Sequence, residues 1–480
     1  MNLSQFNERK IIYLGLLVHL IAAWFSSGWH HPDEHYQIIE FTRAIFSQVE
    51  ASSLPMEYGA QIRPSIQVWL AWLVLKGFGA IGLNQPFVIA FLLRFLMGSL
   101  SIVAAVKLHR SLEFKTDKLK QIHLFLSLLA WTSLYVHVRF SSETFSAFFF
   151  VMGILPFLKK QSGIAVFGGG LLLGLSFVIR FQSGFFLAGL ALQQLIFEKR
   201  KFSDYALILL GFSLSIAVGI LLDRLFYNNW VFTPWEYFNK NILQGLAASF
   251  GTEPFYWYFS QAFEKLIPPF SLILIGSFIN LAYKKPKSVL SWTLWAFILG
   301  HCLVGHKEFR FLFPLAFFLP YLVLEFWDVL WNLSQEVNHK RFMRLMDFLF
   351  MPINLLALFV VMLKPAHELG NLYRFIYDGL PQNSTLVYLK HDPYLSGPNE
   401  ARFYLKKGIT RIPYVAQDSS IAVSSYQPNT FVLSEAWNAP QLEGLKLKMV
   451  YSSFPSWITY LNLNNWLERA NCYKVYEVEK

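Results

Sequence analysis

The chain has 480 residues, of which 55% are hydrophobic, 18% are aromatic and only 15% are charged. A charged fraction well below the roughly one quarter of soluble proteins excludes an ordinary soluble globular protein. The net charge of +11 comes from short basic clusters between long apolar runs, which is typical of cytoplasmic loops and does not indicate a nucleic-acid partner. Apolar runs of this length suit helices better than barrel strands, so we predict an all-α polytopic membrane protein.

The apolar runs predict about eleven membrane-spanning helices. The first, residues 11–29, is longer than a signal-peptide core and has no small-residue cleavage site, so we expect it to remain uncleaved. The other spans are expected near residues 86–106, 121–138, 142–158, 163–180, 181–197, 204–223, 267–283, 288–304, 311–330 and 347–364. The stretch 66–82 is interrupted after a short apolar core, and we expect it to lie flat on the outer surface.

Basic clusters fix the expected orientation, because positively charged loops stay in the cytoplasm. Six clusters are assigned to that side: Arg9-Lys10, Lys107 to Lys120, Lys159-Lys160, Lys199-Arg200-Lys201, Lys284-Lys285-Lys287 and Lys340-Arg341-Arg344. A transmembrane domain over residues 1–365 would then present outer loops that include 30–65, 224–266 and 305–310, the three that carry most of the candidate site residues. Residues 366–480 would follow the last span on the outer face.

The first outer loop opens with His31-Pro32-Asp33-Glu34. Because proline favours a helix start, Asp33 and Glu34 are predicted in a first helical turn, where an ionised carboxylate is stabilised. Asp33 would be available as a proton acceptor, or the acidic turn would only cap the helix. Gln37 and Glu40 are expected to share the face of Asp33. The opposite apolar stripe would lie in the membrane interface and comprises Ile38, Thr42, Ile45 and Val49.

A second polar stretch, His306-Lys307-Glu308-Phe309-Arg310-Phe311, lies between two expected spans. Three potential cations beside one carboxylate at a membrane boundary could hold a phosphate whose lipid tail lies in the bilayer. The alternative is interfacial anchoring, with the basic groups reaching the headgroups and the phenylalanines in lipid.

These two stretches resemble the lipid-linked-oligosaccharide and GPI-anchor mannosyltransferases, glycosyltransferase family 22. Tyr36, Gln37 and Glu40 extend the likeness of the first loop, which together with Arg63 is closest to members that add the third mannose of GPI anchors. The long second outer loop agrees through Asp223, Phe226-Tyr227, Trp230, Thr233-Pro234, Phe238-Asn239, Gly251, Pro254 and Trp257-Tyr258. The resemblance extends to about residue 320, and the 306–311 stretch is its most specific part.

The resemblance implies a GT-C fold whose active site faces the lumen or periplasm and takes mannose from a polyprenyl-phosphate donor, forming an α-mannoside with inversion. Asp33 would be the catalytic base, and Glu34 would cap the helix or orient a donor hydroxyl. His306, Lys307 and Arg310 would bind the donor phosphate, without a metal or other cofactor. The acceptor would be a glycan or glycolipid, and the membrane either the endoplasmic reticulum or a bacterial plasma membrane.

Other ionisable residues are candidates with open alternatives. Arg94, expected in the outer half of a span, could face the donor phosphate or extend to the interface. Arg139 and Glu143 could form an ion pair on one helix surface. Arg180, with Gln182, resembles an Arg-Pro element of the family, but Phe181 replaces the proline. The full set of expected substrate-binding residues is Gln37, Glu40, Arg63, Arg139, Arg180, Asp223, Tyr227, Trp257 and Glu308.

The C-terminal residues 366–480 predict a small α/β domain. Strand-like runs are expected at 384–390, 430–434, 446–452 and 472–478, with a helix over 400–407. Two other functions remain open for the chain: a GT-C transferase of another sugar, and a transporter or flippase of lipid-linked substrates. A transporter would show ionisable groups at the midplane or inverted repeats, and neither is evident in the sequence.

Overall fold

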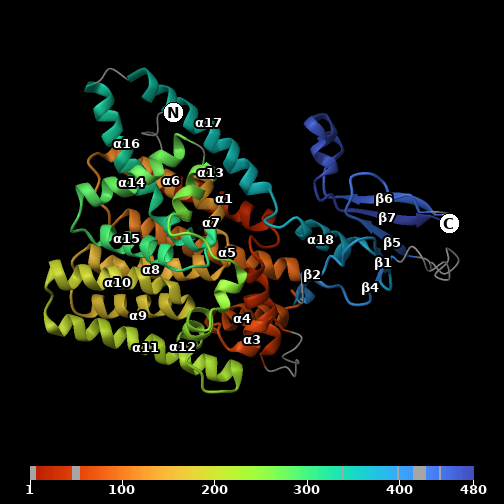
Figure 1. The fold of residues 1–480 in the computed structure, drawn as a ribbon, viewed down its shortest axis with the longest axis horizontal. Coiled ribbons are helices and arrows are strands. Elements are labelled where there is room, and N and C mark those ends of the chain that lie inside the picture. Colours follow the sequence, from red (N-terminus) through yellow and green to blue (C-terminus); the bar gives the residue numbers. More distant parts are fainter. Residues whose placement is uncertain are drawn as a thin grey trace.

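The computed structural model describes residues 7–45, 54–266, 268–336, 340–396, 399–414, 429–442 and 445–479. A helical body is followed by a smaller region around a β-sheet, and the two lie side by side along the long axis (Figure 1). Short 3-10 and π turns are labelled η. The first half of the body contains α1 (Glu8–Phe25), α2 (Pro32–Glu34), η2 (His35–Ile39), η3 (Glu40–Ala44), α3 (Met56–Ala60), α4 (Ile66–Ala80), α5 (Pro86–His109), α6 (Asp117–Leu129), α7 (Trp131–His137), α8 (Ser142–Leu158), α9 (Ile164–Ile179) and η5 (Phe181–Ser183).

The second half of the body continues with α10 (Gly184–Gln193), η6 (Gln194–Glu198), α11 (Phe202–Tyr227), α12 (Thr233–Phe238), η7 (Asn239–Leu243), η8 (Leu246–Phe250), α13 (Trp257–Leu266), α14 (Phe270–Lys284), α15 (Val289–Leu303), η9 (Phe309–Phe317), α16 (Leu319–Glu336) and α17 (Lys340–Leu363). Close packing of α9 against α11 depends on glycine. A Cβ atom on Gly170 would lie 2.2 Å from the carbonyl oxygen of Ile208, and one on Gly211 would lie 2.3 Å from that of Phe167. Small residues allow this backbone approach between helices in lipid.

Three helices in the described residues are long and apolar enough to cross a membrane: Pro86–His109, Phe202–Tyr227 and Met343–Leu363. Two bent pairs could each form a further broken span, namely α7 with α8, bent by 104°, and η9 with α16, bent by 73°. The apolar stretch expected to lie flat forms α4, one of four shorter apolar helices. The chain is therefore a helical membrane protein, and the count of eleven spans stays a prediction.

The segment predicted to be the first outer loop, residues 30–65, differs from the single amphipathic helix expected there. The chain passes from α2 into a π turn over His35–Ile39 and then a 3-10 turn that ends at Ala44. Ile38, Thr42 and Ile45 are buried inside the protein, and Val49 lies outside the described residues. The interfacial helix was therefore a wrong expectation, because the apolar stripe is covered by α4 and α5 and by Phe226 of α11.

The C-terminal region contains α18 (Leu369–Gly379) and a five-stranded sheet. Its strand order is β4 (Thr410–Pro413), β1 (Thr385–Tyr388), β5 (Thr430–Ser434), β7 (Lys474–Glu479) and β6 (Lys446–Ser452). Strand β1 is parallel to β4 and β5, whereas β7 is antiparallel to β5 and β6. The helix expected over 400–407 is absent: β3 (Asn399–Glu400) pairs there with β2 (Leu395–Ser396), and a 3-10 turn follows over Arg402–Tyr404.

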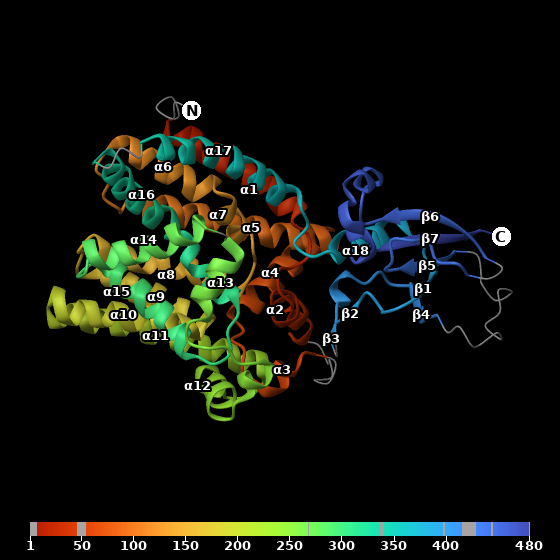
Figure 2. The same cartoon turned by 45° about the horizontal axis from the view of Figure 1, so that its top comes forward.

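One hydrophobic core joins this region to the helical body. Trp29 and Tyr36 of the first outer loop and Phe87 of α5 pack in the same cluster as Tyr373 of α18 and Tyr404. Figures 1 and 2 both place α18 between the helical body and the sheet. The C-terminal region is therefore packed against the loop that carries Asp33.

Candidate active site

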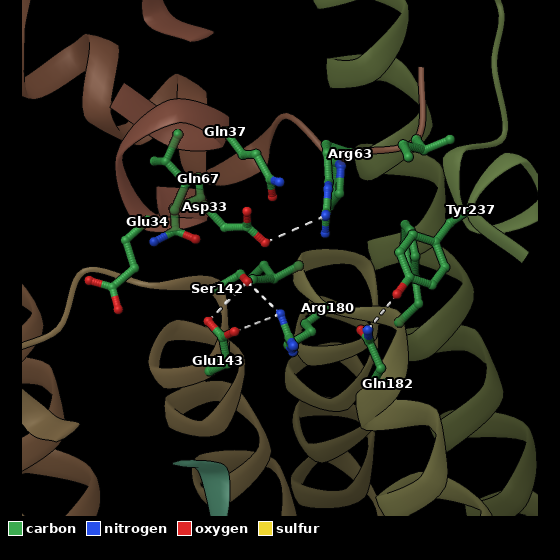
Figure 3. Close-up of a pocket in the computed structure, with 15 residues that line it drawn as sticks. Asp33, Glu34, Gln37, Arg63, Gln67, Ser142, Glu143, Arg180, Gln182 and Tyr237 are labelled. Atoms are coloured by element: carbon green, nitrogen blue, oxygen red, sulfur yellow. Dashed lines mark hydrogen bonds and ion pairs between the residues drawn. The ribbon is translucent and has the colours of Figure 1, made fainter. Parts of the chain in front are cut away.

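Asp33 lies in the short helix α2, and local hydrogen bonds fix this turn. The His31 side chain accepts a hydrogen bond from the Asp33 backbone N–H at 3.3 Å, as an N-cap residue does. The Glu34 carboxylate accepts one from the His30 N–H at 3.1 Å. Asp33 points toward Arg63, whereas Glu34 turns the opposite way (Figure 3). The two adjacent carboxylates therefore face different surroundings.

Arg310 connects the two outer stretches that the sequence singles out. Its Nη2 lies 2.7 Å from Asp33 Oδ2, and its Nη1 lies 3.0 Å from Glu143 Oε1 at the start of α8. Its Nε and Nη2 also contact Glu308, the latter at 3.1 Å. One buried guanidinium thus serves three carboxylates from different parts of the chain. Such charge-assisted contacts are short and directional, and they fix the position of Asp33 relative to residues 308–310.

Two further arginines lie near Asp33. Arg63 Nη2 is 3.7 Å from Asp33 Oδ2 and 4.0 Å from Glu57 Oε1. Arg180 Nη1 is 3.0 Å from Glu143 Oε1. Two buried nitrogens of these side chains, Nε of Arg63 and Nη2 of Arg180, have no hydrogen-bond partner among the described residues. Both arginines thus keep donor capacity for a ligand.

Two adjoining cavities meet at Asp33. The smaller, of about 30 Å³, is lined mainly by polar side chains, including Gln37, Gln67 and Ser142 (Figure 3). The larger, of about 880 Å³, has a mixed wall. Asp33, Arg63 and Arg180 line both cavities. Aromatic and aliphatic side chains line the rest of the larger one, among them Phe177, Phe185, Phe238, Ile242, Phe250 and Leu303.

The charges around the outer loops set opposite pKa shifts for neighbouring carboxyls. Burial acts to raise the pKa of Asp33, but contact with His31 and the charges of Arg310 and Arg63 outweigh it and hold the pKa well below its usual range. Burial also opposes ionisation of Glu308, yet the bond from Arg310 lowers its pKa to about 2. Burial raises the pKa of Glu34 to about 7. Asp33 is therefore ionised at neutral pH, and Glu34 is partly protonated.

The other cations expected at the donor phosphate have different surroundings. Lys307 donates to the carbonyl oxygens of Glu253 at 2.9 Å and Val304 at 2.6 Å, so its ammonium holds the loop backbone. His306 lines the larger cavity and contacts Glu308 at 3.0 Å. Arg94 donates to the Ala23 carbonyl at 2.7 Å and lines neither cavity at Asp33. The structure thus places Arg310 against Asp33 and His306 on the wall of the larger cavity, and it leaves Arg94 apart.

Arg139 and Glu143 do not form the ion pair that their spacing suggested. The chain bends by 104° between α7 and α8, so the two residues are not on one helix surface. Arg139 contacts Ser26 and the Tyr135 carbonyl, whereas Glu143 binds Arg180 and Arg310. Arg139 lines neither cavity at Asp33.

Asp223 and Tyr227 hold the first outer loop in place. Asp223 accepts hydrogen bonds from the Ser65 N–H at 2.8 Å and from the hydroxyls of Ser65 and Thr233 at 2.6 and 2.7 Å. The Tyr227 hydroxyl donates to the Arg63 carbonyl at 2.6 Å. These residues at the end of α11 position Arg63 without lining either cavity.

The remaining expected residues divide between the site and its surroundings. Gln37 lines the smaller cavity and donates to Glu57 at 2.8 Å. Glu40 does not share the face of Asp33: the intervening π turn has more residues per turn than an α-helix, and Glu40 binds His35 and the Phe403 N–H instead. Trp257 packs against the helical core and lines neither cavity at Asp33.

Two further residues contact the site, and the sequence argument gave neither of them a role. His31 lies 3.5 Å from Asp33 Oδ1 and 3.4 Å from Glu308 Oε2, which places it between the two outer stretches. Tyr237 accepts a hydrogen bond from Gln182 at 2.6 Å, and its ring lies 5.8 Å from the Arg63 guanidinium. The HPDE motif contained His31, but no local pattern singled out Tyr237.

Comparison with known proteins gives a family for this arrangement. Residues 10–388 match the Alg9-like mannosyltransferase family. The chain belongs to this family. Among curated relatives, Mannosyltransferase APTG1 of Arabidopsis thaliana is 25% identical over 317 residues, covering 64% of this chain and 56% of the relative. GPI alpha-1,2-mannosyltransferase 3 of Bos taurus is 24% identical over 347 residues, covering 71% of this chain and 61% of the relative.

The chain thus spans somewhat more than half the length of these family members. Among solved structures, ArnT from Cupriavidus metallidurans in the apo state aligns with a TM-score of 0.51 and 13% identity, covering 97% of this chain and 96% of that one. At this identity the likeness concerns the fold alone. The helical body of this family member therefore has the GT-C fold that the sequence resemblance implied.

Proposed function

We propose that the protein is an inverting mannosyltransferase that moves mannose from a polyprenyl-phosphate donor to a hydroxyl of a glycan or glycolipid. The observation that carries this proposal is the Asp33 carboxylate, held by Arg310 at 2.7 Å at the junction of two cavities. Membership of a mannosyltransferase family supports the choice of sugar.

Asp33 acts as the general base in this proposal. As the acceptor oxygen forms a bond to the anomeric carbon, its proton passes to the Asp33 carboxylate. The bond from the anomeric carbon to the phosphate oxygen breaks on the opposite face, and its electron pair leaves with the phosphate. A β-linked donor then yields an α-mannoside. The low pKa of Asp33 keeps the carboxylate ionised at neutral pH.

Arg63 and Arg180 are the cations best placed to bind the donor phosphate. Each has a buried nitrogen without a partner among the described residues, and both line the larger cavity. His306 on the same wall is a further donor. Fixed cationic donors stabilise the charge that develops on the leaving phosphate. Arg310 is occupied by three carboxylates, so we assign it chiefly to orienting Asp33.

The larger cavity is assigned to the donor. Its volume of about 880 Å³ lies within the usual range of small-molecule sites. The apolar side chains of its wall suit the first units of a polyprenyl chain, and the arginines suit the phosphate. The smaller polar cavity, of about 30 Å³, has room for a single acceptor hydroxyl, which amide groups such as Gln37 and Gln67 can bind.

The proposed topology has eleven spans, with a transmembrane domain over 1–365 and an outer domain over 366–480 in the lumen or periplasm. A cysteine introduced at Ser249, which is exposed in the second outer loop, should react with an impermeant label applied from outside, and one at Ser111 should not. Ser52 and Ser420 are further outer positions expected from the sequence, and they lie outside the described residues. Reversed labelling would overturn the orientation.

The function is tested by incubating the purified protein with labelled polyprenyl-phosphate-mannose and a panel of mannosylated glycolipids and glycans. The names of the curated relatives, such as GPI alpha-1,2-mannosyltransferase 3, place GPI-type glycolipids first in the panel. Asp33→Asn serves as the inactive variant, and Asp392→Asn as a matched change in the C-terminal region, where Asp392 pairs with Arg411 at 2.7 Å. Transfer by the wild type and Asp392→Asn alone supports the proposal. Transfer from another polyprenyl-phosphate sugar, or donor binding without any transfer, refutes it.

A further inference from the structure

A cluster of aromatic rings crosses the boundary between the first outer loop and the C-terminal region. Trp29 stacks on His367 and on His35, with ring centroids 4.5 Å apart in each pair. Tyr404 stacks on His35 at 5.2 Å and on Trp29 at 6.3 Å. Trp29, His35 and Tyr404 are all buried. Stacked aromatic pairs add to the free energy of area burial, so this cluster favours one relative position of the two segments.

A polar contact lies beside this aromatic cluster. The Glu40 carboxylate accepts a hydrogen bond from the Phe403 N–H at 2.8 Å and lies 3.0 Å from His35 Nε2. Glu40 and His35 are each only 1% exposed. A carboxylate this deeply buried is costly unless it is hydrogen-bonded. Glu40 therefore binds the first outer loop to the turn Arg402–Tyr404.

We call the turn around Asp33, residues 31–34, the catalytic turn. The C-terminal region also contacts the segment just before it. The backbone N–H groups of Ala366 and His367 donate to the Ser27 carbonyl at 2.8 and 3.3 Å. Gly28 has a φ of +81°, and a Cβ atom there would lie 2.6 Å from the His367 Cβ. The C-terminal region thus contacts the loop on both sides of Asp33, at Ser27 to Trp29 and at His35 to Glu40.

We propose that Tyr404, together with Glu40, positions the catalytic turn, so that the C-terminal region sets the reach of Asp33 into the site. This inference rests on the proposed function. Tyr404 lies beyond residue 388, where the match to the family ends, so the contact is argued from this chain alone. Tyr404 and Glu40 line neither cavity at Asp33, and they act through the turn.

The expected effect falls on turnover more than on donor binding. Arg63 follows α3, and Arg180 follows α9, so the proposed phosphate ligands do not depend on the Tyr404 contact. A displacement of about 1 Å in a reacting group can cost about a hundredfold in rate. Loss of the ring of Tyr404 should therefore lower kcat and leave KM for the donor nearly unchanged.

Tyr404→Leu tests the inference against two controls. Tyr404→Phe keeps the stacked ring. Phe375→Leu removes a ring from the same core at a place away from the catalytic turn, where the Phe375 and Tyr451 ring centroids lie 4.8 Å apart. For Tyr404→Leu we expect kcat to fall at least tenfold and donor KM to change less than threefold. Backbone hydrogen exchange of residues 29–40 should become faster. Tyr404→Phe and the folded fraction of Phe375→Leu should keep kcat within threefold.

Two results would overturn the inference. One is an unchanged kcat and unchanged exchange in Tyr404→Leu, and the other is an equal loss of kcat in Phe375→Leu at the same folded fraction. If Tyr404→Leu does not accumulate, Glu40→Gln weakens the contact with less volume change, and the same two readouts apply. Hydrogen exchange decides the positioning even if the wild type transfers no mannose, in which case the proposed function itself fails.

Discussion

Replacing Asp33 with asparagine removes the proposed proton acceptor while keeping the size of the side chain. General-base catalysis contributes about two to four decades in rate, or about 3 to 5 kcal/mol of barrier. The structural cost should be small. Arg310 keeps Glu143 at 3.0 Å and Glu308 as partners, so its charge is not left unpaired. A partly exposed pair such as Asp33 with Arg310 contributes about 1 kcal/mol to stability.

The assay measures transfer of labelled mannose at saturating donor, together with donor affinity and the thermal unfolding midpoint in the same detergent. We expect a loss of at least about a hundredfold in kcat, with donor affinity and unfolding midpoint close to the wild type. Glu34→Gln is the matched control, because Glu34 turns away from Arg63 and binds the His30 N–H. It should cost less than about tenfold. A preserved rate in Asp33→Asn, or a large loss confined to Glu34→Gln, would refute the assignment of the base.

Three further predictions concern the surroundings of Asp33. Arg310→Ala should destabilise the fold by about 3 to 5 kcal/mol, because three carboxylates lose the cation that they share. Arg310→Lys should restore only part of the stability and activity. A wild-type unfolding midpoint in Arg310→Ala would contradict this prediction. Asp223→Ala should lower the unfolding midpoint and weaken donor binding, because it removes the hydrogen bonds to Ser65, the residue before α4, that help to position Arg63. Calorimetry and a donor-binding assay measure the two effects. Unchanged donor affinity would show that Asp223 does not position the donor site. Burial raises the pKa of Glu34 from 4.5 to about 7, so the stability that its protonated form contributes is complete below pH 4.5 and is lost as pH rises through 7. Glu34→Gln should therefore become more stable than the wild type between pH 6 and pH 8, by up to about 3 kcal/mol at the upper end. A difference in unfolding midpoint that does not change with pH would count against a buried carboxyl.

The sequence predicted that the two stretches of the site lie on one face of the membrane, but it did not predict the contact between them. The HPDE motif and the 306–311 stretch were both assigned to outer loops from the basic clusters alone. The structure brings them together through Arg310 and Asp33, which are 277 positions apart in the chain. Motif residues and loop parity were sufficient to propose that these stretches share one site, although neither gave the three-carboxylate geometry.

Side chains whose direction depends on distant partners could not be predicted. Helical spacing put Glu40 beside Asp33, yet the π turn between them and the Phe403 N–H, 363 positions away, draw it to the C-terminal region. The same spacing paired Arg139 with Glu143, but Arg139 lies in the connection where the chain bends by 104° between α7 and α8. Lysine is a residue type that often binds phosphate, but the Lys307 ammonium donates to loop carbonyl oxygens instead. Local periodicity assumes one continuous α-helix, and the expectations for Glu40 and Arg139 failed because the helix is interrupted at both places.

The network around Asp33 also bears on how a strongly paired carboxylate can act as a base. With Arg310 and Arg63 beside it, Asp33 has a pKa well below its usual range, and a weak base takes a proton slowly. A donor phosphate in the larger cavity would bring negative charge to Arg63. It would draw the Arg63 guanidinium away from the Asp33 carboxylate, which now lies 3.7 Å from Arg63 Nη2. The added charge and the lost contact both raise the pKa of Asp33. Donor binding would thus increase the basicity of Asp33 only when a leaving phosphate is in place, which couples proton acceptance to the presence of the donor.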